Sequence, residues 1–302
     1  GWTDYESLKK KRKDLVMVTL KGDRHGGPEV DYTVNPSIGI PNITGAEGSL
    51  EPVANALPAW DCIAGNMVVS SLLAAERDRL RTGKGQNVEF ALKDAAAAIV
   101  GHLGMIGEAT ISDEQRGKSG NSLYGAYGQD FECSCGGRVI VIGLTLRQWR
   151  GLLKAMDKTD EIKKLEEELN VSLDDEGRRW VHRHEINNIF RPWFAKRKIT
   201  EFEKGFNDLG LTWSQFRTMK EAIDEDGDTF ADNPMFETQD FDGIGKYMVP
   251  RSPVEFSNHL AISPEKPPKL GQHTEEILAD IMGLGSGEIG VLFDSGIVSF
   301  AK

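Results

Sequence analysis

The longest apolar run of the chain extends from Cys62 to Ala75, and the rest of the sequence is organised around it. It ends in alternating charges, Glu76 to Arg81. The run is too continuous for an ordinary surface helix and too short to cross a bilayer, so it predicts a buried core helix. Asp61 follows the turn at Pro58 and directly precedes the run. This places its carboxylate at the helix N-terminus, where unpaired amides and the helix dipole favour a negative charge.

Shorter patterns on both sides of this run predict the other elements. A mostly apolar stretch at 15–20 is typical of a buried parallel strand, and a second strand is expected at 87–92, after the long helix. Apolar residues recurring at three- and four-residue intervals predict helices further along the chain. The remaining predicted elements are a helix opening at Asp94, a strand at 139–143, helices at 146–156, 158–169, 177–195, 199–209 and 219–224, and an extended piece at 212–213.

This order of elements predicts an α/β protein with two domains. A large domain would hold an open, Rossmann-like parallel sheet, and a smaller domain would be α+β. We expect the large domain to cover residues 1–120 and the small domain 121–225. Residues 226–302 would form a linker and a C-terminal return to the large domain.

Composition narrows the range of functions. The chain has 302 residues, 39% hydrophobic and 27% charged, as in an ordinary globular protein with an ample core. Its net charge of −11 argues against a nucleic-acid partner, which needs a basic footprint. Three cysteines form no disulfide framework and suit a reducing cytoplasm. No signal peptide and no membrane-spanning apolar run is visible.

Several short motifs fail on their spacing, so the sequence predicts no metal site. Cys133 and Cys135 lack a second pair of zinc ligands. The charge run that begins at Asp224 resembles a calcium loop, but Thr229 and Met235 stand where glycine and glutamate are required. The glycine–lysine turn at 83–86 lacks the serine or threonine of a phosphate-binding loop.

Three blocks of sequence together resemble the family III CoA-transferases. The first is Asp61 heading the apolar helix, followed by Arg81-Thr82-Gly83-Lys84-Gly85-Gln86, a short strand and Lys93-Asp94-Ala95. The second is Pro268 to Leu278, closing with Asp294 to Val298. The third is Asp232-Asn233-Pro234, followed by Val249-Pro250-Arg251-Ser252-Pro253. The resemblance covers essentially the whole chain.

The resemblance implies that Asp61 is the nucleophile that carries CoA covalently. It also implies an acyl-CoA thioester of a small dicarboxylic acid as the substrate, with CoA as part of that substrate and no separate cofactor. From the residues alone, an aspartate at a helix start most often only caps backbone donors. That structural alternative stays open at this point.

Two loops and one strand end supply the candidate binding residues. In the family, the segment at 30–36 approaches the thioester, and a glycine-bearing segment at 116–128 covers the reactive aspartate. Polar residues in such loops otherwise cap turns. The candidates for contacts with the acyl group or CoA are Tyr32, Asn35, Leu92, Gly120, Asn121, Tyr124 and Gly125.

Four functions are compatible with this resemblance. Segments 30–36, 101–106 and 120–125 look most like the family members that move CoA between two carboxylates of one molecule. The alternatives are transfer between two acids, for example from succinyl-CoA, then a 2-methylacyl-CoA racemase, then a non-catalytic CoA-binding subunit. Racemisation is disfavoured because Val30 and Leu146 align with the histidine and glutamate of the racemases, and neither can carry a proton.

The resemblance also leads to expectations about assembly. Family members are interlocked homodimers, and the long connections at 110–137 and 225–255 are compatible with that. The chain opens at Gly1 without a methionine, close to a strand that needs neighbours on both sides. We therefore expect the N-terminal part of the family fold, with much of the CoA pocket, to lie outside this chain or in a separate segment.

Overall fold

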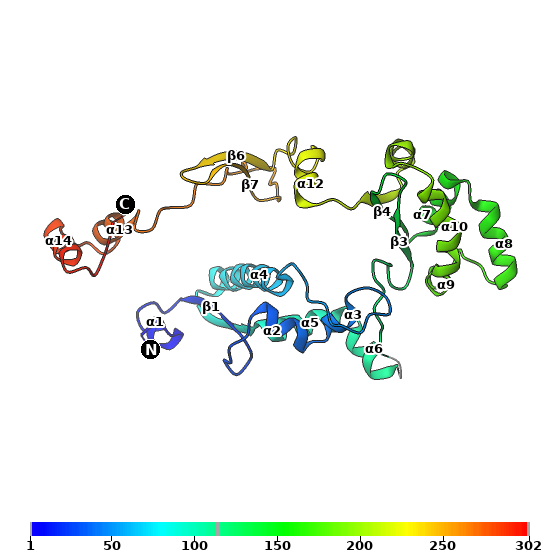
Figure 1. Ribbon diagram of the computed structural model, residues 1–302. Coiled ribbons are helices and arrows are strands. Elements are labelled where there is room, and N and C mark those ends of the chain that lie inside the picture. Colours follow the sequence, from blue (N-terminus) through cyan, green and yellow to red (C-terminus); the bar gives the residue numbers. More distant parts are fainter. Residues whose placement is uncertain (1, 113–114, 301–302) are drawn as a thin grey trace. The chain divides into compact units, whose positions relative to one another are not determined.

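The computed structural model describes residues 2–112 and 115–300 (Figure 1). The chain separates into two compact units, with the boundary between Phe216 and Arg217. The domain limits expected from the sequence, at 120 and 225, stay a prediction.

The N-terminal half of the first unit is built around a parallel pair of strands. Strand β1 (Val16–Lys21) pairs with β2 (Gln86–Ala91), so that Val18 lies opposite Val88. The long helix that precedes β2 in the chain, α4 (Ala59–Thr82), packs on both strands (Figure 1). Both predicted strands and their parallel arrangement are thus confirmed. The other helices here are α1 (Tyr5–Lys9), α2 (Asp31–Ser37), α3 (Ile40–Ile43), α5 (Leu92–His102) and α6 (Met105–Ile111).

Helices α2, α4 and α5 meet in a small core. Its buried members are Val34, Trp60, Ala64, Leu92, Ala96 and Val100. The segment 31–37 was expected to be a loop, and it is a helix despite Pro36 in its last turn. Pro36 has no N–H to donate to the carbonyl of Tyr32, so this short helix forms with one intrahelical hydrogen bond fewer.

The expectation that the long apolar helix is buried was wrong for most of its length. Of its 24 residues, only Trp60, Ala64 and Ala75 are buried. Four large apolar side chains are instead exposed, namely Val69, Leu72, Leu73 and Leu80. A helix that is apolar on all sides normally lies inside a structure. Here a sheet of only two strands covers one side of it.

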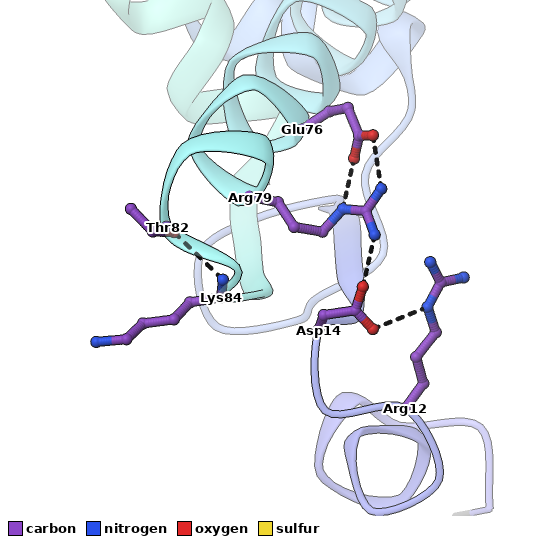
Figure 2. A network of polar contacts seen from close by, with 6 residues as sticks. All are labelled: Arg12, Asp14, Glu76, Arg79, Thr82 and Lys84. Atoms are coloured by element: carbon purple, nitrogen blue, oxygen red, sulfur yellow. Dashed lines mark hydrogen bonds and ion pairs between the residues drawn. The ribbon is translucent and has the colours of Figure 1, made fainter.

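An ion-pair network ties the end of α4 to the approach to β1 (Figure 2). Arg79 donates to both oxygens of Glu76 and, at 2.6 Å, to Asp14. The hydrogen bond from Arg79 also lowers the pKa of Asp14. Gly83 ends the helix in the left-handed conformation, at φ 73°, which is typical of a glycine at the end of a helix.

The second half of this unit is an antiparallel sheet covered by helices. Strand β4 (Arg138–Gly143) lies between β3 (Tyr127–Glu132) and β5 (Thr212–Gln215). The predicted helix at 146–156 is confirmed as α7 (Leu146–Met156), but the one expected at 177–195 is interrupted at His182. The remaining helices are α8 (Thr159–Leu169), α9 (Glu176–Val181), α10 (Arg183–Ala195), η1 (Ile199–Glu201) and α11 (Glu203–Asp208).

Aromatic side chains dominate the core of this half. Phe131 of β3 stacks on Phe194 of α10, with ring centroids 4.7 Å apart. Tyr127 lies edge-on to Trp149 and to Phe190, and all three are almost fully buried. Rings in these geometries gain stability beyond their buried area. The fold class is therefore as predicted: a parallel α/β part and a smaller α+β part.

The second unit begins with α12 (Met219–Glu225) and contains a hairpin that the sequence pattern did not predict. Strand β6 (Phe236–Phe241) pairs with β7 (Gly245–Pro250) across a turn in which Gly243 and Gly245 both have positive φ. After this come α13 (Thr274–Glu276), η2 (Ile277–Ile281), a π-helical turn, and α14 (Ser286–Asp294).

Candidate active site

Asp61 is an exposed residue in the first turn of α4. The helix begins at Ala59, and Pro58 occupies the N-cap position without a side-chain cap. Within residues 2–112 and 115–300, the Asp61 carboxylate accepts no hydrogen bond from a backbone amide. Asp61 therefore does not cap its helix, and its carboxylate is open to a reactant at the positive end of the helix dipole.

The capping is supplied by another helix. The buried carboxylate of Asp31, on α2, accepts a hydrogen bond of 2.7 Å from the backbone N–H of Trp60. One turn further along α2, the side-chain oxygen of Asn35 accepts one of 3.0 Å from the Trp60 indole N–H. The residue directly before Asp61 is thus fixed through both its backbone and its side chain.

These contacts change the interpretation of the first candidate segment. Asn35 is 2% exposed and faces Trp60, which gives it a role inside the protein. Tyr32 lies between Asp31 and Asn35 in the sequence of α2, and its side chain is 62% exposed. Sequence reasoning missed Asp31, although its spacing of four from Asn35 puts both on one helix face. Leu92 is a core residue of the same cluster.

The glycine-bearing segment at 116–128 contributes residues to two places away from Asp61: a cluster around Tyr124 and a polar cavity. Tyr124 donates a hydrogen bond of 2.8 Å to Glu108, and the Arg116 guanidinium lies 3.8 Å from the centre of its ring. The ring of Trp180 also packs against it, with the two ring centroids 5.0 Å apart. The hydrogen bond to Glu108 raises the pKa of Tyr124, and the one from Arg116 lowers the pKa of Glu108. The Tyr124 side chain is therefore fixed in its position by contacts with Glu108, Arg116 and Trp180.

Gly120 and Asn121 line a polar cavity of about 560 Å³. The N–H of Gly120 donates to the carbonyl of Gly45 at 3.0 Å. Burial would raise the pKa of Asp130 in this cavity, but hydrogen bonds from Arg138 and Asn121 outweigh it and lower that pKa. The cavity lining also includes Glu47, Ser122, Gln129, His184, Asn187 and Arg191. Asp61 is not among the lining residues, so the structure does not gather all the candidates into one site.

Other chemistry is sparse in the part of the chain that the structure describes. It contains no group of three or more His, Cys, Asp or Glu residues arranged to hold a metal ion. Burial raises the pKa of the Cys133 thiol to about 11, while Cys62 and Cys135 are exposed. Among the described residues, no helix has the length and apolar character needed to cross a membrane.

Sequence comparison identifies the protein family to which the chain belongs. The sequence profile of CoA-transferase family III matches residues 2–274. The chain belongs to this family. The family assignment made from the three sequence blocks is thereby confirmed.

Two kinds of relatives stand out within CoA-transferase family III. The chain is 47% identical to 2-methylfumaryl-CoA isomerase of Chloroflexus aurantiacus over 299 residues, which is 99% of this chain and 73% of the relative. It is 23% identical to succinyl-CoA:glutarate CoA-transferase of Mus musculus, spanning 97% of this chain and 66% of that protein. The chain thus spans only part of the length of both relatives.

Solved structures agree on the fold. A CAIB/BAIF family protein from Brucella suis matches with a TM-score of 0.70 at 22% identity, covering 92% of this chain and 71% of the other. Rv3272 from M. tuberculosis matches with a TM-score of 0.69 at 18% identity, covering 90% and 71%. At these identities the likeness shows the fold of family III and nothing about the substrate.

Proposed function

We propose that this chain transfers CoA from the C1 to the C4 carboxyl group of mesaconate, and so isomerises 2-methylfumaryl-CoA. The observation that carries the proposal is the 47% identity to 2-methylfumaryl-CoA isomerase over nearly the whole chain. The exposed, uncapped carboxylate of Asp61 supports it, because such a group can act as a nucleophile. Donor and acceptor are then one molecule, an acyl-CoA of a small dicarboxylic acid.

The transfer needs only Asp61 as a covalent carrier. An ordinary aspartate, with a reference pKa of about 3.9, is ionised at neutral pH without a general base. Its carboxylate attacks the C1 thioester carbonyl, which gives a mixed anhydride and releases the CoA thiolate. The thiolate attacks the aspartyl carbonyl of this anhydride. The products are an aspartyl-CoA thioester and a free C1 carboxylate.

The second half repeats these steps at C4. The C4 carboxylate attacks the aspartyl-CoA thioester, gives a second anhydride and again releases the thiolate. The thiolate attacks the C4 acyl carbonyl, which forms the product thioester and restores the Asp61 carboxylate. Each tetrahedral intermediate needs N–H donors near its oxyanion. CoA enters as part of the substrate, so we propose no further cofactor.

We further propose that a second copy of the chain covers the exposed apolar side of α4. Val69, Leu72 and Leu73 are 55%, 44% and 63% exposed and lie three and four residues apart, on one side of the helix. A contiguous exposed apolar patch of this kind marks an interaction site. This supports the interlocked homodimer expected for the family. The free thiols Cys62 and Cys135 support a reducing cytoplasm as the location.

The decisive experiment follows the position of CoA on the acyl group. Purified protein is incubated with mesaconyl-C1-CoA, with and without free dicarboxylic acids, and the products are separated by chromatography. We expect C4 thioester to form at a rate that does not depend on the added acids. Borohydride or hydroxylamine trapping should label Asp61. A protein that leaves the C1 thioester unchanged and unlabelled would contradict the proposal.

The second candidate is transfer between two different acids. It is supported by the relatives that use succinyl-CoA, at 22–23% identity. In the same experiment this function would give product only when an acceptor acid is added. A chain that exchanged the α-proton of a 2-methylacyl-CoA with deuterium would instead be a racemase.

A further inference from the structure

The strongest unassigned feature is the double attachment of Trp60 to helix α2. Its backbone N–H donates to Asp31 at 2.7 Å, and its indole N–H donates to Asn35 at 3.0 Å. All three residues are nearly inaccessible, at 6%, 3% and 2% exposed. A buried carboxylate and a buried amide are costly to retain unless their hydrogen bonds serve the structure or the function.

The first bond replaces a missing cap. The first turn of a helix has amides without intrahelical partners, and a side-chain oxygen at the N-cap usually accepts from one of them. Proline at position 58 cannot provide that oxygen. Asp31, 29 residues earlier in the chain, accepts from the Trp60 amide in its place.

The second bond fixes the direction of the same residue. With the Trp60 indole held by Asn35, the side chain cannot rotate without leaving a buried acceptor unpaired. The Trp60–Asp61 peptide unit is therefore constrained from both ends of Trp60. Within residues 2–112 and 115–300 the Asp61 side chain accepts no hydrogen bond from the backbone, so its placement depends on the constraint on the preceding residue.

We propose that Asp31 and Asn35 are positioning residues that orient Asp61 for nucleophilic attack, acting through Trp60. This inference rests on the proposed function of Asp61. Neither residue touches the reacting atoms in this arrangement. A displacement of about 1 Å at a nucleophile can cost about 100-fold in rate, so loosening Trp60 should slow acylation.

A purely structural role would have a different outcome. Breaking these bonds would then lower the melting temperature, but the folded fraction would react at the normal rate. The test therefore compares the rate of Asp61 acylation with stability. The matched control is Val100→Ala, which truncates a residue of the same buried cluster on α5 and leaves both hydrogen-bonding partners of Trp60 in place.

The experiment uses the full chain and mesaconyl-CoA in single turnover, with quenching and borohydride trapping of the thioester. The variants are Asp31→Ala, Asp31→Asn, Asn35→Leu and Trp60→Phe. We expect the acylation rate at saturating substrate to fall about 10- to 100-fold in Asp31→Ala, with KM changed less than about threefold. Asp31→Asn keeps an acceptor for the Trp60 amide, so it should recover most of the rate.

Trp60→Phe and Asn35→Leu remove the same bond from opposite ends. We expect each to slow acylation by about 10-fold, and the double variant to be no slower than either single one. If Asp31→Ala does not fold, Trp60→Phe still tests the positioning role, because it keeps the hydrogen bond from the backbone N–H of residue 60 to Asp31. Val100→Ala should lose stability and keep the wild-type acylation rate.

Two results would overturn different claims. If wild-type protein forms no thioester on Asp61, the proposed function fails before any variant is compared. If wild-type protein forms it, and Asp31→Ala and Trp60→Phe react as fast as Val100→Ala, the positioning role is wrong. Multiplying effects of Trp60→Phe and Asn35→Leu would likewise contradict the inferred indole contact.

Discussion

Two aspartates near the start of α4 have opposite environments. Asp31 is buried and accepts a hydrogen bond from the backbone of Trp60, whereas the side chain of Asp61 is exposed and accepts none from the backbone of the described residues. A carboxylate that stabilises structure needs partners, while a nucleophile needs an accessible, unpaired oxygen. The chemical difference between these identical side chains therefore comes from their neighbours.

Replacing Asp61 tests this difference directly. We expect Asp61→Asn to lower the transfer rate by at least about a thousandfold, because the amide cannot form the anhydride. The melting temperature should hardly change, since the side chain is exposed. Asp78→Asn, at another exposed position of α4, is the control and should remain fully active. Full turnover by Asp61→Asn would remove the basis of the mechanism.

The pair of Asp130 and Arg138 gives a prediction about acid stability. Although burial opposes it, hydrogen bonding from Arg138 lowers the folded-state pKa of Asp130. This contribution to stability is therefore present above the unfolded pKa, about 3.9, and is lost as the pH falls through the folded value.

Arg138→Gln should raise the folded-state pKa of Asp130, so the acid loss of stability should begin at higher pH. The measurement is the melting temperature between about pH 2 and pH 7. The control is Arg150→Gln, which breaks an exposed pair with Asp174 and should leave the pH dependence unchanged. If the melting temperatures of wild type and Arg138→Gln fell in parallel as the pH is lowered, Arg138 would not be lowering the pKa of Asp130.

At the scale of elements, the turn from α4 into β2 is limited by space. Gly83 takes a left-handed conformation, and nothing lies within 4 Å of where its Cβ would be. At Gly85 a Cβ would lie 2.1 Å from the backbone oxygen of Leu15. The two glycines are thus required for different reasons, the first for its backbone angle and the second for close approach of two chain segments.

These reasons predict different tolerances. Gly85→Ala should destabilise the protein by about 1–3 kcal/mol or more. The clashing atom is the carbonyl oxygen of Leu15, which can move only together with the backbone of its segment. Gly83→Asn should cost less than about 1 kcal/mol, since asparagine accepts positive φ. Chemical denaturation of both variants provides the comparison. Equal losses at the two positions would contradict the steric argument.

At the scale of the whole molecule, the exposed apolar side of α4 is the main feature that one chain leaves unexplained. Leu73 is 63% exposed in the middle of a helix that packs on a two-stranded sheet along one side only. A second copy covering this side would bury it. The proposed dimer therefore makes a prediction about a residue far along the helix from Asp61.

Leu73→Glu should shift the protein from dimer to monomer in analytical ultracentrifugation, because a charge would have to be buried in the contact. Transfer activity should fall with the dimer fraction. Asp78→Lys reverses a charge at an exposed position five residues after Leu73, on a different face of the helix, and should leave the association unchanged. A Leu73→Glu protein that sediments like wild type would place the contact elsewhere.

Local pattern was enough to predict the elements that depend on local physics. The limits of α7, the two parallel strands and the position of Asp61 in the first turn of a long helix all follow from periodicity and helix-end signals. The hairpin of β6 and β7 was missed because β6 is mostly polar and both strands are mostly exposed, so neither shows the alternation that marks a half-buried strand.

By itself, the sequence determined the family, the fold class and the choice of Asp61 as the nucleophile to test. Only the tertiary structure decided what surrounds it: that Asp31 caps a helix 29 residues away, that Asn35 holds an indole, and that α4 is largely uncovered. The physical reason is range. Helix and strand patterns depend on neighbours within a few residues, whereas hydrogen-bond partners and burial depend on which distant segments the fold brings into contact.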